Sequence, residues 1–239
     1  MGGASRPGWL GNLPGRQVPP SYPRMNPRFD LSLCLVTDPE MTARRGLVET
    51  VAAAVEGGVT MVQLRHKDGP AHMMVEAGRA LHALLAPRGI PLIVNDRVDV
   101  AHAIGAEGVH VGQDDLPPAT ARAILGPRAI IGLSITGESQ LAGCDPAAVD
   151  YVGLGPLFPT DTKADATRAL GEAAFAAMRR RLPCPVVAIG GITVRNAARA
   201  IAAGADGIAV VSAICAADDP RAAAQTLRAA VDAAREKSG

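Results

Sequence analysis

The chain has 239 residues, 48% hydrophobic and 20% charged, which is enough apolar material for one large α/β domain. Its net charge of +1 provides no overall field for nucleic acid or acidic membranes, and 3% aromatic residues leave few platforms for stacking bases. No apolar stretch approaches the ~20 residues needed to span a bilayer. The composition therefore argues against nucleic-acid and membrane partners.

From Phe29 onward, short β-branched runs alternate with alanine-rich stretches of helical period. The predicted strands cover residues 31–36, 61–64, 91–94, 108–111, 130–133, 151–154, 186–189 and 207–211. The predicted helices cover residues 46–56, 71–85, 98–104, 117–125, a short segment after Glu138, 172–181, 194–203 and 220–235. Eight strand-helix pairs with continuously apolar strands predict a single-domain (β/α)8 TIM barrel of the α/β class. A doubly wound open sheet is the alternative, but no Gly-x-Gly-x-x-Gly turn follows the first strand.

The first 27 residues form a separate segment, rich in proline and glycine and without periodic apolar residues. Such a segment cannot bury enough surface to offset its ordering entropy, so residues 1–27 are predicted to be a disordered leader and 28–239 the barrel domain. It lacks the apolar core of a secretory signal, and its proline density argues against a transit peptide.

Glycine and cysteine positions predict structural roles. Glycines in 56–60, 105–108 and 204–207 mark three helix-to-strand turns, where a left-handed residue caps the helix. The cysteines are widely spaced, which excludes a zinc knuckle and a disulfide framework and favours a reducing, cytoplasmic compartment. Cys34 lies in an apolar run and is predicted to be a buried thiol.

Candidate ligand-contacting residues, most of them polar, lie at or just after the ends of the predicted strands, where TIM barrels carry their catalytic groups. In strand order they are Gln63, Leu64, Arg65, His66 and Lys67; Asn95 and Asp96; Asp115; Ser134; Thr160, Asp161, Thr162 and Lys163; Gly191; and Val211 and Ser212. Taken singly, each has an ordinary explanation: Asp96 and Asp115 could cap helices, and Arg65 and Lys67 could be surface charges. Their convergence at one end of one barrel favours a site.

The combined chemistry of these residues suits phosphorylated ligands. Arg65, Lys67 and Lys163 supply cations for a polyanion, and Asp96 and Asp115 on neighbouring strands could share Mg2+, which together suggest a diphosphate. Backbone N–H groups at 190–191 and 211–212 could bind a second anion at helix N-termini. Two anion sites imply two phosphorylated ligands or one doubly phosphorylated ligand.

The histidines and possible nucleophiles of the sequence do not indicate a site for proton transfer. No nucleophilic triad is present, and His72, His82 and His102 fall within predicted helices. His110 is predicted to pack inside the end of its strand. The site therefore suits charge stabilisation in a transition state.

These motifs together resemble the thiamine phosphate synthase family over residues 30 to about 220. The matching motifs are Gln63-Leu64-Arg65-x-Lys67, Asn95-Asp96, Gly112-Gln113-x-Asp115, Ser134, Pro159-Thr160-x-Thr162-Lys163, Gly190-Gly191-Ile192 and Ser212-Ala213-Ile214. The resemblance implies a transferase in thiamine biosynthesis that joins 4-amino-2-methyl-5-(diphosphooxymethyl)pyrimidine to a thiazole phosphate, releasing diphosphate by a Mg2+-dependent dissociative substitution.

The resemblance also implies roles for individual residues. Asp96 and Asp115 would hold Mg2+, and the thiazole phosphate would lie at 160–162, Gly191, Val211 and Ser212. The pyrimidine diphosphate would be bound by Gln63, Arg65, Lys67, Asn95, Ser134 and Lys163, with Leu64, His66 and Asp161 counted among the substrate contacts. Arg65, Lys67, Ser134 and Lys163 would be the catalytic residues.

Two positions depart from the family pattern: His66 stands where many members have Glu, and Thr136 where several have His. Two alternative functions stay open, a thiazole tautomerase-like isomerase and a non-catalytic sensor of thiamine precursors. Thr136 and the complete diphosphate motif set argue against them. The sequence also leaves a homo-oligomer open.

Overall fold

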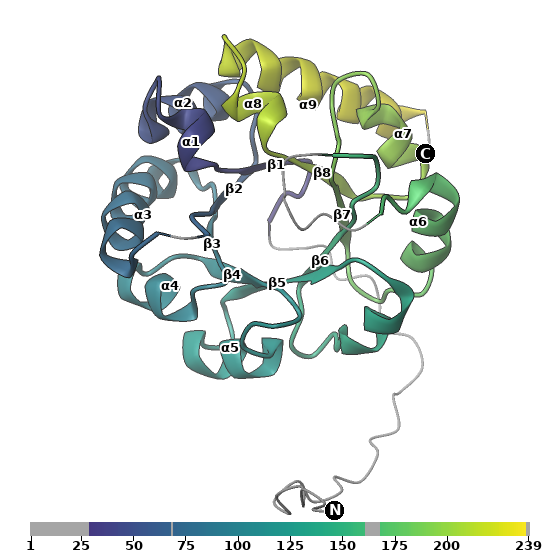
Figure 1. Cartoon of the computed structure of the whole chain (residues 1–239), viewed down its shortest axis with the longest axis horizontal. Coiled ribbons are helices and arrows are strands. Elements are labelled where there is room, and N and C mark those ends of the chain that lie inside the picture. The colour runs from purple at the N-terminus through teal and green to yellow at the C-terminus, as the bar shows by residue number, and fades with distance from the viewer. Residues whose placement is uncertain (1–28, 68, 161–167, 238–239) are drawn as a thin grey trace, which may run out of the picture.

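The computed structural model describes residues 29–67, 69–160 and 168–237, so the predicted disorder of residues 1–27 lies outside the described part. Eight parallel strands close into a barrel in chain order, β1 to β8, as predicted. Helices surround the barrel on its outside (Figure 1). The strands are Leu33–Val36, Met61–Leu64, Leu92–Asn95, Gly108–Val111, Ile130–Ile135, Tyr151–Leu154, Val186–Ile189 and Gly207–Val210.

The helices follow the predicted order, with three short additions. The main ones are α2 (Leu47–Glu56), α3 (Ala71–Leu85), α4 (Val98–Ile104), α5 (Pro118–Leu125), α6 (Gly171–Arg179), α7 (Ala197–Ala202) and α9 (Pro220–Glu236). After Glu138 the chain forms a 3-10 helix, η2 (Glu138–Gly143), and another, η1 (Ala86–Arg88), extends α3. The single-turn helices α1 (Pro39–Thr42) and α8 (Ser212–Cys215) were not predicted, because four residues carry no helical periodicity.

Alternation along each strand separates two apolar clusters. On β1, Leu33 and Leu35 belong to the cluster that includes helix residues such as Leu81 and Leu227, whereas Cys34 and Val36 belong to a smaller cluster with Tyr151 and other strand residues. The smaller cluster fills the barrel interior, where side chains from several strands form packed layers. Cys34 is 2% exposed, which confirms the predicted buried thiol. All four cysteines are buried and free.

The end of the barrel where the strands begin has a structural role. Gly58, Gly105 and Gly204 have φ angles of 103°, 68° and 100°, so the three predicted helix-to-strand turns use positive-φ glycine. Carboxylates at this end accept strand N–H groups: Asp150 from Ile131 and Asp206 from Val186, both at 2.8 Å. These side chains satisfy backbone donors at the base, which gives this end of the barrel a structural role.

No helix in the described part of the chain is long and apolar enough to cross a membrane.

Candidate active site

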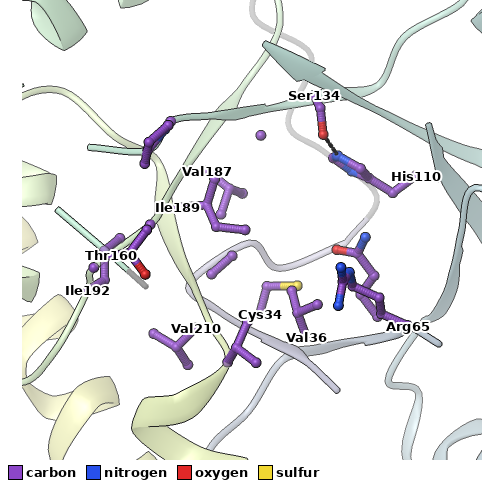
Figure 2. Close-up of a pocket in the computed structure, with 18 of the residues that line it drawn as sticks. Cys34, Val36, Arg65, His110, Ser134, Thr160, Val187, Ile189, Ile192 and Val210 are labelled. Carbon is purple, nitrogen blue, oxygen red and sulfur yellow. Dashed lines mark hydrogen bonds between the residues drawn. The ribbon is translucent and has the colours of Figure 1, made fainter. Parts of the chain in front are cut away.

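A cavity of about 250 Å³ opens at the end of the barrel where the strands finish. We call its two sides the polar wall (Gln63, Arg65, Asn95, His110 and Ser134, from β2 to β5) and the apolar wall (Val187, Ile189, Ile192 and Val210, from β7, β8 and the loop after β7). Figure 2 shows Arg65, His110 and Ser134 facing Thr160, Ile192 and Val210 across the cavity. A ligand here contacts charged and amide groups on one side and aliphatic groups on the other.

Two polar residues of neighbouring strands fix each other on the polar wall. The Gln63 Nε2 amide donates to Asn95 Oδ1 at 2.7 Å. Gln63 is 6% exposed and stays hydrogen-bonded, as a buried amide requires. This bond sets both amide orientations, leaving Gln63 Oε1 and the Asn95 amide nitrogen for a ligand.

Arg65 is held from two directions. Its backbone N–H donates to the buried Thr37 hydroxyl at 3.0 Å, and its guanidinium lies 4.0 Å from the Asp38 carboxylate. Asp38 also caps α1 by accepting from the N–H groups of Glu40 and Met41. The short helix α1 therefore brings a carboxylate beside Arg65. Sequence reasoning missed this contact because α1 itself was missed.

His110 and Tyr151 form part of the site that sequence reasoning did not assign. The His110 ring lies 2.9 Å from the Ser134 hydroxyl through Nε2 and 2.9 Å from the Tyr151 hydroxyl through Nδ1. His110 is buried within the strand end, as predicted, but it also lines the cavity. Alternation along β4 could have revealed this, because His110 lies in register with Asn95 on β3.

The two carboxylates predicted to bind a metal lie in adjacent loops, after β3 and β4. The Asp96 N–H donates to the His110 carbonyl at 2.8 Å, and Asp96 has a φ of 62°, the only positive φ of a non-glycine residue in the described segments. The Asp115 carboxylate accepts from the Gly112 N–H at 2.7 Å through Oδ2. Helices α4 and α5 have no side-chain cap, so these carboxylates do not serve as the caps considered from sequence.

The apolar wall adjoins loops that approach each other closely. Gly190 and Gly191, after β7, have φ angles of 92° and 64°. A Cβ atom on Gly191 would lie 2.3 Å from the Pro159 carbonyl oxygen, so only glycine allows this contact between the loops after β6 and β7. Helix α7 begins at Ala197 rather than the predicted Val194, and α8 is a single turn. The backbone N–H groups of Gly190 and Gly191 are therefore loop donors and not helix N-terminal ones.

Burial keeps two groups at the base of the cavity in their neutral forms. Burial raises the pKa of Cys34 to about 12, so it remains a thiol at neutral pH. Burial also raises the pKa of Tyr151 well above its ordinary value. No carboxylate lines the cavity among the described residues, and Arg65 is the one charged group there. The described lining suits an anion and contains no acidic side chain to act as a base.

The structure brings together eight of the thirteen predicted site residues that it describes. Those lining the cavity are Gln63, Arg65, Asn95, Ser134, Thr160, Gly191, Val211 and Ser212. Others lie beside it or point away: Leu64 is 2% exposed in the helix-facing cluster, and His66, Lys67, Asp96 and Asp115 are outside the lining. The predictions for Asp161, Thr162 and Lys163 lie outside the described residues.

Comparison with known proteins identifies the relationship. The family described as thiamine monophosphate synthase matches residues 33–214. The chain belongs to this family. Among relatives, thiamine-phosphate synthase of Xanthobacter autotrophicus is 58% identical over 207 residues, covering 87% of this chain and 98% of the relative. That of Azorhizobium caulinodans is 56% identical over 207 residues, with the same coverage.

Solved structures agree with the family assignment. Thiamine phosphate pyrophosphorylase from Pyrococcus furiosus matches with a TM-score of 0.77 and 38% identity, covering 85% of this chain and 96% of that one. A 3-hexulose-6-phosphate synthase, at 19% identity and a TM-score of 0.60, shares the fold alone. The recognition drawn from the strand-end motifs and the barrel predicted from the periodicity are both confirmed.

The two departures from the family pattern have different environments. The Thr136 N–H donates to Gln140 Oε1 at 2.7 Å, and Thr136 lines the cavity. His66 is half-buried beside the cavity, and its Nδ1 atom is buried with no hydrogen-bond partner among the described residues. Thr136 is therefore placed to contact a ligand directly, while His66 is not.

Proposed function

We propose that this protein catalyses the joining of a pyrimidine diphosphate to a thiazole phosphate, yielding thiamine phosphate and diphosphate. The observation that carries the proposal is the shared cavity: eight predicted substrate-binding residues line it, from β2 around the barrel to the loop after β8. Membership in the thiamine monophosphate synthase family supports the same activity. The reaction breaks the methylene C–O bond to diphosphate and forms a C–N bond to the thiazole nitrogen.

The polar wall suits the pyrimidine diphosphate. Gln63 and Asn95 present amide groups in orientations fixed by their mutual hydrogen bond, which supports recognition of a heterocycle with donor and acceptor atoms. Arg65 supplies a guanidinium for phosphate oxygens, with Lys67 beside the cavity and Lys163 proposed to join them. Ser134 adds a hydroxyl at the cavity surface. Together these groups would stabilise negative charge as diphosphate departs.

The opposite side suits the thiazole phosphate. Val187, Ile189 and Val210 offer an apolar surface for the ring. Thr160 and Ser212, with the loop N–H groups at Gly191, supply donors for a phosphate, and Asp161 and Thr162 extend this proposed set. Val211 lines the same region. The two substrates would thus bind with the reacting carbon and nitrogen between the walls.

The residues present fit the Mg2+ ion predicted from sequence. Asp96 and Asp115 follow the neighbouring strands β3 and β4. The described segments contain no larger group, of three or more His, Cys, Asp or Glu residues, that could hold a metal. Mg2+ favours one or two carboxylate ligands, with water and phosphate oxygens in its other coordination positions. The positive φ of Asp96 is a strained conformation of the kind that concentrates at functional sites. When bound, Mg2+ would neutralise charge on the leaving diphosphate.

A dissociative substitution agrees with the groups at hand. The nitrogen that attacks carries a lone pair, so bond formation needs no base, and no carboxylate lines the described cavity. Cys34 and Tyr151 keep their protons at neutral pH. The apolar wall excludes water that would otherwise capture the pyrimidine-methyl cation.

The decisive experiment measures product formation by the purified full chain. We expect thiamine phosphate and diphosphate only when both substrates and Mg2+ are present, and no product after chelation with EDTA. Turnover of the thiazole phosphate alone would instead indicate an isomerase. Binding of precursors without any diphosphate release would indicate a sensor.

Two broader features belong to the same proposal. Free thiols at all four cysteines support a reducing, cytoplasmic location. Light scattering of the purified chain tests whether it forms a homo-oligomer.

A further inference from the structure

A chain of hydrogen bonds runs from the barrel interior to the cavity surface. Tyr151, 2% exposed, reaches His110 Nδ1 through its hydroxyl at 2.9 Å. On the opposite edge of the ring, His110 Nε2 reaches the Ser134 hydroxyl at 2.9 Å, a contact visible in Figure 2. The three residues come from β6, β4 and β5, so the barrel assembles them from separate strands.

Two glycines make room for this chain. Gly132 pairs with His110 on one side and Tyr151 on the other, and a Cβ atom there would lie 2.3 Å from His110 Nδ1 and 2.4 Å from the Tyr151 ring. A Cβ atom on Gly153 would lie 3.0 Å from His110 Cε1. The inward positions of β5 and β6 are thus small where the imidazole and phenol meet, so the contact depends on glycine.

The Tyr151 hydroxyl has one hydrogen-bond partner among the described residues, His110 Nδ1. If the Tyr151 hydroxyl accepted a hydrogen bond from Nδ1–H, its own O–H would be buried without an acceptor among the described residues, which is unfavourable. An imidazole protonated on both nitrogens would have the same fault, because its Nδ1–H would also donate to the Tyr151 hydroxyl. The favoured arrangement is therefore a neutral imidazole whose Nδ1 accepts from Tyr151.

We propose that Tyr151 is a positioning residue that fixes the Nε2–H tautomer of His110, so that Ser134 donates its hydroxyl proton into the cavity. With Nε2–H donating to Ser134 Oγ, the serine proton points to an acceptor other than His110. No other described residue forms a hydrogen bond with Ser134 Oγ. The acceptor that fits is a phosphate oxygen of the departing diphosphate, and this assignment of the acceptor rests on the proposed function.

The opposite tautomer of His110 would reverse the direction of its hydrogen bond with Ser134. Ser134 would then donate to Nε2 and present only lone pairs to the cavity, which would repel a phosphate oxygen. Tyr151 thus acts three hydrogen bonds away from the departing diphosphate, and its effect should appear where negative charge grows, in kcat more than in KM.

The first test reads the tautomer directly in the wild-type protein. A long-range 1H–15N NMR spectrum of the five histidines, with His110 assigned by its loss in His110→Asn, should show Nε2 protonated and Nδ1 unprotonated at pH 8. A protonated Nδ1, alone or together with Nε2, would overturn the proposal. This measurement needs neither substrate nor turnover, so it stands even if the proposed reaction fails.

The second test is a double-mutant cycle. Tyr151→Phe should lower kcat about 10-fold, the worth of one hydrogen bond to a charged group, with both KM values within about twofold. In a Ser134→Ala background, Tyr151→Phe should have no further effect on kcat. An equal loss in both backgrounds would show that Tyr151 only supports packing and would overturn the inference.

A matched control removes a buried hydroxyl elsewhere. Thr50→Val deletes the 2.7 Å bond from Thr50 Oγ1, on α2, to the Gly46 carbonyl; Thr50 lies outside the cavity lining, so the variant should leave kcat unchanged. If the wild-type chain forms no thiamine phosphate, the proposed function fails, and the NMR result still decides the tautomer.

Discussion

The two walls of the cavity present different parts of the polypeptide to a ligand. The polar wall uses side chains whose chemistry is visible in the sequence, such as Arg65 and Ser134. The apolar side uses aliphatic surface and the backbone of the Gly190–Gly191 loop, whose donors any residue could supply if the backbone took this shape. Substitutions should therefore act through charge on one side and through shape on the other.

The sharpest test of the polar side is Asp115→Asn. The amide oxygen can still accept from the Gly112 N–H, so the loop is kept while the negative charge is lost. Turnover should fall by about 100-fold because the metal binds more weakly and neutralises the leaving group less well. Diphosphate release measured against Mg2+ concentration should show a higher half-saturating concentration.

The neighbouring Asp114 provides the control. Asp114→Asn changes the charge of the same loop by the same amount at an exposed position outside the cavity lining, and should keep wild-type Mg2+ dependence. If the two variants behaved alike, Asp115 would have no special role in holding the metal.

The shape of the apolar side is tested by Gly191→Ala. The added Cβ would lie 2.3 Å from the Pro159 carbonyl, and the φ of 64° already disfavours alanine, so the loops after β6 and β7 must move apart. We expect the KM for the thiazole phosphate to rise about 10-fold, with a smaller change for the pyrimidine substrate. Initial rates with each substrate varied in turn measure the two values.

Gly105→Ala separates the effect of backbone strain at a positive φ from the effect of a contact between loops. Gly105 has a similar φ of 68° but nothing within 4 Å of its added Cβ, so this variant should lose about 1 kcal/mol of stability with unchanged KM values. A rise in KM in Gly105→Ala as large as in Gly191→Ala would mean that general destabilisation, and not loop contact, explains the result.

The effect that is smallest at neutral pH concerns Cys34 at the base of the cavity. Its thiol has a pKa near 9 when exposed and about 12 when folded, so the folded state holds the proton more tightly. The stability from this group is intact below pH 9 and is lost as pH rises from 9 toward 12. Denaturant unfolding should show the wild type losing up to about 1.4 kcal/mol per pH unit more than Cys34→Ala in this window. Equal slopes would mean that the thiol ionises as easily in the folded state as in the unfolded one.

Periodicity located the elements well. The strands Met61–Leu64 and Gly108–Val111 and the helix Ala71–Leu85 have the predicted bounds, because their apolar residues recur at a clear spacing. The helices α1 and α8 escaped prediction because one turn is too short to show a period, and with α1 the contact of Asp38 with Arg65 was missed. Strong local signals were sufficient only where an element was long enough to repeat them.

The sequence by itself determined the barrel fold, the family and the set of candidate site residues at the strand ends. Only the tertiary structure decided which of these residues share the cavity, and it added His110 and Tyr151 while turning Leu64 toward the helices. The physical reason is that strand register and inward or outward facing depend on hydrogen bonds between segments far apart in the chain, such as Gly132 with both His110 and Tyr151. No single stretch of residues contains that information.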